Sequence, residues 1–161
     1  MGNITKETLA SGKVLKVLAD QFLASREKAT LFSMLSCLRD STVVIPTIPK
    51  MSERDEKELL EHAEVGYIFT NKDPIKYEPD TLVAPDGTKW FPVFSSEDEV
   101  VGDYKDHNFS YIPITVVNCI RMAHTFDVKG IVLDPFTRGI DLPFPIADII
   151  PSMESKIEKE N

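Results

Sequence analysis

The clearest structural signal in the chain is the stretch Asp80-Thr-Leu-Val-Ala-Pro-Asp-Gly-Thr-Lys-Trp-Phe-Pro-Val-Phe-Ser-Ser-Glu-Asp-Glu99. Two apolar runs rich in β-forming residues flank a Pro85-Asp86-Gly87 turn, which predicts a hairpin over residues 80–95. The second run stops at Ser95-Ser96, and serine hydroxyls are typical helix caps. Residues 97–99 are therefore expected to begin a short helix.

Two helices and a buried strand are predicted before this hairpin. The first helix is expected to start at Asn3 or Thr5, with Leu15, Leu18 and Phe22 at helical spacing on one face. A second helix is predicted over residues 26–38 and is ended by Asp40-Ser41. The unbroken β-branched run that follows, residues 42–46, favours a strand covered on both faces.

The segment between this strand and the hairpin is largely polar, and a helix, a strand and a turn are predicted within it. Ser52 is expected to cap a charged helix that runs to about residue 63. Alternating apolar residues predict a strand over 65–69, which a turn at 71–74 ends.

Beyond the hairpin, Pro113 is placed in the first turn of a helix. Residues 128–133 are predicted as a second buried strand that ends at Asp134-Pro135. A last helix is expected from Pro145, with a kink at Pro151.

This order of elements predicts an α+β (mixed α/β) fold. Helices, strands and one hairpin follow one another without a repeat or a linker, so we expect a single domain in which helices flank a mixed sheet. The domain is assigned to residues 1–151 and a charged tail to residues 152–161, and this tail is expected to fray from Glu154.

Composition and charge narrow the classes of function. The chain has 161 residues, 42% of them hydrophobic, and a formal net charge of −8. Nucleic-acid and anionic-membrane binders need clustered positive charge, so neither is an expected partner. No apolar run reaches the ~18 residues of a membrane span. Cys37 and Cys119 are expected to be buried apolar residues rather than a disulfide, which favours a cytoplasmic protein.

Four stretches share the pattern of one known family. They are Leu35-Ser-Cys-Leu38, Ser41-Thr-Val-Val-Ile-Pro46, the hairpin residues 86–97, and Gly130-Ile-Val-Leu-Asp-Pro-Phe136. Together they resemble the N-terminal domain of the SseB family, named for enhanced serine sensitivity in bacteria. The resemblance implies a mixed α/β domain of a bacterial, cytoplasmic protein and no established enzymatic activity. Two departures are visible: Ser95 stands where the family has Thr, and Asp134 where it has Asn.

Motifs for catalysis and cofactor binding are not found in the sequence. It contains no G-x-G-x-x-G, Walker or G-x-S-x-G pattern, so we expect no cofactor and assign no catalytic residue. The strongest metal candidate is an acidic loop that lacks the ordered spacing of a calcium site, and we assign no metal ligand. Its residues are Glu97, Asp98, Glu99, Asp103, Asp106 and His107.

Two groups of residues are the candidates for binding. Trp90, Phe91 and Phe94 lie on the second hairpin strand, where alternate side chains point to opposite faces. Helices are expected to cover both faces, and an exposed face would instead offer aromatic surface to a partner. The second group is Asp134, Phe136 and Arg138. It follows the carboxyl end of a buried strand, where loops of α/β sheets often bind ligands.

The leading hypothesis is a non-enzymatic interaction or regulatory module that binds a protein partner through these two groups. The first alternative is a small-molecule sensor of amino acids, in which Asp134 pairs with the ligand ammonium and Arg138 with its carboxylate. The second alternative is a metal-dependent hydrolase that uses the acidic loop. The sequence leaves self-association into a homo-oligomer open.

Overall fold

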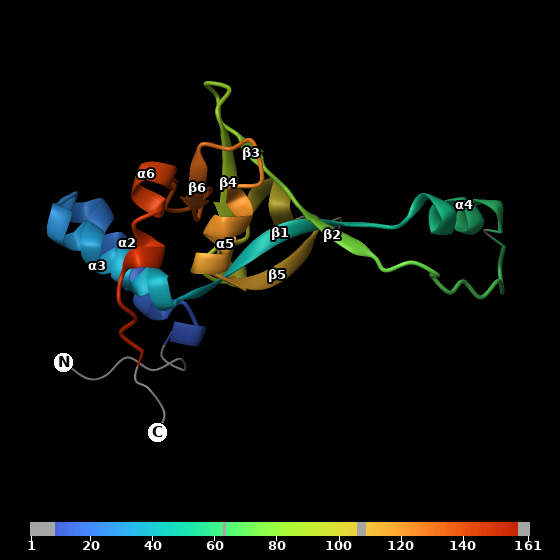
Figure 1. The fold of residues 1–161 in the computed structure, drawn as a ribbon, viewed down its shortest axis with the longest axis horizontal. Coiled ribbons are helices and arrows are strands. Elements are labelled where there is room, and N and C mark those ends of the chain that lie inside the picture. The colour runs from blue at the N-terminus through green and yellow to red at the C-terminus, as the bar shows by residue number, and fades with distance from the viewer. Residues whose placement is uncertain (1–8, 63, 106–108, 158–161) are drawn as a thin grey trace.

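The fold has a packed body from which one long arm projects. The structure is a computed structural model, and it describes residues 9–62, 64–105 and 109–157. Figure 1 shows the body on the left, with helices α2, α3, α5 and α6 and most strands, and the arm on the right, ending in the helix α4. We call residues 48–79 the arm and the other described residues the body.

Two helices form the outer layer of the body. Helix α2 (Lys13–Ser25) buries Leu15 and Ala19, and helix α3 (Lys28–Asp40) packs against it. Gly12 precedes α2 with a φ of 74°, so the backbone turns at this residue. The predicted start at Asn3 or Thr5 lies outside the described residues.

The strands form two sheets, where the sequence analysis expected one. In the first sheet, β1 (Thr42–Lys50) lies between β2 (Lys76–Pro79) and β5 (Ser110–Thr115), and both pairings are antiparallel. The second sheet has the order β3 (Leu82–Val83), β4 (Lys89–Val93), β6 (Gly130–Leu133) and β7 (Ile140–Pro143).

The second sheet is mixed, as predicted. Strands β4 and β6 are parallel, while β3–β4 and β6–β7 are antiparallel. The two sheets meet at Val44 and Phe94, whose backbones exchange N–H···O bonds of 2.9 and 2.8 Å. The chain therefore has the α+β architecture that the sequence predicts.

Most of the apolar core lies between the helices and the sheets. Helix α5 (Val116–Ala123) buries Val116, Cys119 and Ile120, and it contacts both α3 and β6. The short helix α6 (Phe144–Ala147) and a 3₁₀ turn at Ile150–Ser152 complete this layer. A second, smaller cluster of Phe94, Val100 and Tyr104 lies beside two further 3₁₀ turns, Glu97–Glu99 and Gly102–Lys105.

The hairpin is confirmed, and its turn is fixed by local chemistry. The Asp86 carboxylate accepts bonds from the backbone N–H and hydroxyl of Thr88, at 2.9 and 2.6 Å. Gly87 has a φ of 88°, a conformation that glycine adopts without strain. The helix expected after the hairpin is only the single 3₁₀ turn Glu97–Glu99.

Two predictions of secondary structure are wrong. Residues 65–69 form no strand: Val65 and Ile68 are 109% and 86% exposed, so no neighbouring strand or core selects the extended form. Pro113 does not open a helix. It lies in β5 opposite Val44, and the helix begins at Val116 after the cap Thr115.

The C-terminal segment is held more firmly than predicted. The Asp40 carboxylate accepts hydrogen bonds from the Ser155 hydroxyl at 2.6 Å and from the Lys156 N–H at 2.7 Å. Ile157 packs against the core. Within the described ranges, no helix is both long and apolar enough to pass through a membrane.

Candidate functional site

The aromatic residues of β4 are largely structural. Phe91 and Phe94 are each 0% exposed, and they belong to different core clusters on the two faces of the strand. The alternation predicted from the sequence is therefore correct, and in this structure both rings lie in the core, where they are not accessible to a partner. Trp90 is half-buried, and its indole N–H donates to the Thr88 hydroxyl at 3.0 Å.

Asp134 is the most buried charged residue of the second candidate group. It follows β6 with a φ of 48°, in the left-handed region that Asp and Asn enter most readily among residues other than glycine. Its side chain is 0% exposed. The carboxylate accepts the Ser95 N–H and the Ser95 hydroxyl, each at 2.8 Å, and so ties the end of β6 to the end of β4.

Arg138 connects this carboxylate to helix α2. Its guanidinium lies 3.0 Å from Asp134, 3.2 Å from Glu99 and 2.9 Å from Asp20. Lys16 on α2 adds an ion pair of 3.3 Å to Glu99. These charges join three distant parts of the chain into one ionic cluster, which we call the Arg138 cluster.

The titration of the cluster reflects burial and charge together. Burial raises the pKa of Asp134, although hydrogen bonds from Ser95 and Arg138 oppose that change. For Glu99 the balance is reversed: burial acts to raise its pKa, but bonds from Thr137 and Arg138 hold it below its usual value. The pKa of Arg138 is raised because its three carboxylate partners outweigh the effect of burial.

The amino-acid-sensing hypothesis needs two groups that this cluster already uses. Asp134 was expected to hold a ligand ammonium and Arg138 a carboxylate, but both side chains have partners within the chain. A ligand would have to displace those partners at a fully buried carboxylate, which is costly. Phe136 is 41% exposed, and its ring packs against Tyr104 at 5.7 Å between centroids.

The acidic loop lies only partly within the described residues. Asp106 and His107 are outside them, as is the side chain of Asp103. Among the described residues, no three His, Cys, Asp or Glu side chains gather closely enough to hold a metal. Burial raises the pKa of the Cys37 thiol and brings that of Cys119 to about 12, so neither thiol is activated as a nucleophile.

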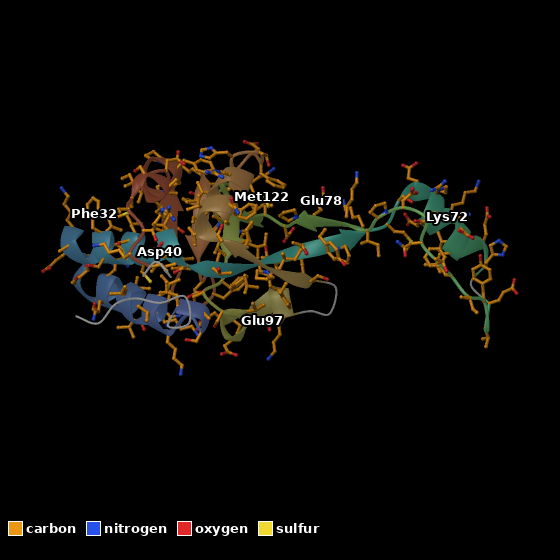
Figure 2. The ribbon with its side chains drawn as sticks, turned by 60° about the horizontal axis from the view of Figure 1, so that its bottom comes forward. Phe32, Asp40, Lys72, Glu78, Glu97 and Met122 are labelled. Atoms are coloured by element: carbon orange, nitrogen blue, oxygen red, sulfur yellow. The ribbon has the colours of Figure 1, made fainter. Side chains whose placement is uncertain are left out.

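The arm is held together by polar contacts. Ser52 caps α4 (Glu53–Glu61) by accepting the Asp55 N–H at 3.2 Å. The Asp55 carboxylate is 0% exposed and accepts the N–H groups of Lys72 and Asp73 at 2.9 to 3.0 Å. Figure 2 shows Lys72 at this far end of the molecule. Asp55 therefore fastens the returning chain to α4.

Further polar contacts close the end of the arm. The Tyr67 hydroxyl donates to Glu58 at 3.0 Å, and the Tyr67 ring stacks on His62 with 4.9 Å between centroids. Lys72 also pairs with Glu58 at 3.6 Å. We call residues 52–73, which these contacts hold together, the tip of the arm.

The apolar side chains of the arm point outward. Leu60, Val65 and Ile68 at the tip are 73%, 109% and 86% exposed. Most of the exposed large apolar side chains of the described chain lie in the arm, which also includes Ile48, Leu59, Tyr67, Ile75 and Tyr77. Apolar residues in these numbers on a projecting segment are typical of a contact surface.

The exposed apolar side chains of the arm were not among the residues predicted from the sequence to bind a partner. The available signal was the pair Leu59-Leu60 in an otherwise charged helix, which has too few apolar positions to bury a full helix face. The alternation over residues 65–69 was attributed to a strand, and that interpretation hid the exposed pair Val65 and Ile68.

A comparison with known proteins supports the family resemblance of the sequence motifs. The sequence model of the SseB protein N-terminal domain matches residues 15–145. No curated protein and no solved structure matches the chain. The matched region runs from α2 to the start of α6 and includes both sheets, the arm and the Arg138 cluster. The chain therefore belongs to the SseB family, through its N-terminal domain.

Proposed function

We propose that this chain is a non-enzymatic protein-interaction module whose arm inserts into a partner protein. The single observation that carries the proposal is the exposure of Leu60, Val65 and Ile68 at the tip of a projecting segment. Burying such side chains stabilises an association by about 25 cal/mol for each Å² of apolar surface removed from water. They bury little apolar surface within the chain itself, because they are 73–109% exposed.

The charge of the arm indicates what kind of protein it binds. Residues 48–79 contain eight acidic and five basic side chains, and the whole chain has a net charge of −8. A second copy would bring like charges together, which disfavours self-association through the tips. The partner we propose is a different protein with an apolar pocket bordered by Lys and Arg.

The test places a photocrosslinking amino acid at Val65 of the full chain, in cells that naturally produce it. The expected result is one discrete adduct to a second protein. The matched control carries the same group at Val83, which is 60% exposed on the hairpin of the body. The adduct should be absent from this control and lost when Leu60 and Ile68 are both changed to Ser.

Two results would overturn the proposal. One is the absence of a discrete adduct at Val65, or the same adduct at Val83. The other is an adduct of twice the 18.1 kDa chain, which would identify a second copy as the occupant.

A further inference from the structure

A groove of about 790 Å³ lies on the body, well away from the tip. Its floor is the outer face of the β1–β5 pair, where Thr42 lies opposite Thr115 and Val44 opposite Pro113. The intervening side chain of Val43 points to the other face and is 0% exposed in the core. The walls come from residues 9–10, 95–97 and 155–157.

The lining of the groove is mainly aliphatic. Apart from Val43, whose side chain faces the core, the apolar residues are Leu9, Ala10, Val44, Pro113, Val117 and Ile157, and the described lining contains no aromatic ring. Rings that stack are the usual means of holding nucleobases and other flat ligands. The lining thus favours an occupant with aliphatic side chains.

One polar atom in the groove wall lacks a partner. The Ser96 hydroxyl oxygen is buried and makes no hydrogen bond to any described residue. Buried polar atoms without partners are rare in folded proteins, so each one calls for an explanation. Turned about its Cα–Cβ bond toward the groove, this hydroxyl would gain a hydrogen-bond partner from a molecule bound there.

The charges around the groove are not equally available. Asp40 is occupied by Ser155 and Lys156, and the Arg39 Nε–H donates to the Met153 carbonyl at 3.0 Å. Glu97 is exposed and has no ion pair within the described chain. Figure 2 shows Asp40 and Glu97 on the body, far from Lys72. Charge complementarity therefore calls for a cation beside Glu97.

We infer that this groove binds an extended peptide segment of another protein, with aliphatic side chains on the floor and a Lys or Arg beside Glu97. The volume lies within the roughly 300–1,000 Å³ range of ligand sites, and a single amino acid would leave most of it empty. Thr42 on the floor, Ser96 in the wall and Asn118 in the lining are polar residues that can bond to the peptide backbone. This site is separate from the arm and does not rest on the proposed function.

The test selects peptides from a random heptapeptide phage library on the immobilised full chain. The expected result is enrichment of sequences that combine two or more aliphatic residues with a Lys or Arg. Synthetic peptides of the selected sequence are then titrated into each variant. Thr42→Arg fills the groove from an exposed position and should weaken binding at least tenfold. Glu97→Lys should remove the preference for a basic residue.

Two control variants separate the groove from other apolar surfaces. Val17→Arg changes a 55% exposed residue of α2 that does not line the groove, and it should leave peptide affinity unchanged. The Leu60→Ser/Ile68→Ser variant should also leave it unchanged, because the tip is a different surface. No enrichment, or affinity that survives Thr42→Arg, would overturn the inference. So would affinity that is lost in the tip variant alone, and that result would leave the proposal for the arm standing.

Discussion

Different interactions hold the body and the arm together. In the body, apolar side chains such as Phe91 and Leu35 are fully buried, and the charge of Asp134 is enclosed among partners. In the arm, the buried side chain is the carboxylate of Asp55, and Leu60, Val65 and Ile68 lie in water. Folding does not account for the apolar residues of the tip, and this is the basis of the binding role proposed for the arm.

The comparison separates stability from binding. The packing of the body should set the free energy of unfolding, because apolar burial is the dominant favourable contribution to folding. The arm should set recognition, because its apolar residues are available and its shape depends on a few hydrogen bonds. The two regions should therefore respond independently to substitution.

The largest expected effect comes from the core of the body. Phe94→Ala should lower the free energy of unfolding by about 3–5 kcal/mol, because it removes a fully buried ring and leaves a cavity. The arm control Leu60→Ala should change it by no more than about 0.5 kcal/mol. Denaturant unfolding of both variants provides the measurement, and similar losses would break the distinction between the regions.

The next largest effect is expected at the Arg138 cluster. Asp134→Ala should cost about 2–3 kcal/mol, because it leaves the buried Ser95 N–H without its acceptor and Arg138 without one of its carboxylates. Asp134→Asn keeps an oxygen for Ser95 and tolerates the left-handed backbone, so it should cost about 1 kcal/mol or less. Equal losses in the two variants, measured by denaturant unfolding, would show that charge rather than hydrogen bonding matters there.

Acid should act on the two regions in opposite directions. Burial raises the pKa of Asp134, so its contribution to stability is complete below the unfolded value of about 4 and is lost as pH rises through the higher folded value. Wild type should therefore gain stability relative to Asp134→Asn as the pH falls towards 4. Denaturant unfolding of both proteins across this range measures the difference, and a constant difference would contradict the prediction.

In the arm, hydrogen bonds from the Lys72 and Asp73 N–H groups hold the pKa of Asp55 below its usual value. Its contribution is complete above about pH 4 and is lost as the pH falls through the lower folded value. Amide exchange measured by NMR should show Lys72 and Asp73 losing protection in that acidic range, while amides of β6 keep theirs. Simultaneous loss in both regions would mean that the arm does not open separately.

The smallest effect on global stability is expected from Asp55→Ala. Without the carboxylate, the N–H groups of Lys72 and Asp73 lose their acceptor and the returning chain is released from α4. Amide exchange at the tip should rise strongly, with the denaturation midpoint of the body unchanged. The control Asp86→Ala removes the equivalent carboxylate from the hairpin turn of the body and should leave the tip protected. Fast exchange at the tip in that control would contradict an independent arm.

Sequence reasoning succeeded where a structure is specified by neighbouring residues. The Asp86-Gly87 turn and the Ser52 cap each depend on atoms two or three residues away, and both were predicted. It failed where the secondary structure depends on a pairing with a residue distant in the sequence. Pro113 is acceptable in either a helix or an edge strand, and its pairing with Val44, far away in the sequence, selects the strand.

The candidate site was predictable only in part, for the same reason. Asp134 and Arg138 stood out because they follow a buried strand, but the partners that occupy them, Ser95 and Asp20, come from other elements. Apolar patterning cannot show whether a side chain faces the core or water, and this is why the exposed residues of the tip were read as a strand. The sequence thus marked the arm as a polar segment and did not show that its apolar side chains are exposed.

The chain enters and leaves the arm at adjacent points: Thr47 at its base is the register partner of Pro79. The arm is therefore the connection between two paired strands, β1 and β2. The entropy cost of closing such a connection depends only weakly on its length. A short turn or an arm of a different sequence could occupy the same place without altering the strand order of the body. Under the proposed function, recognition would therefore be exchangeable: replacing a single contiguous segment would give the same scaffold a new specificity.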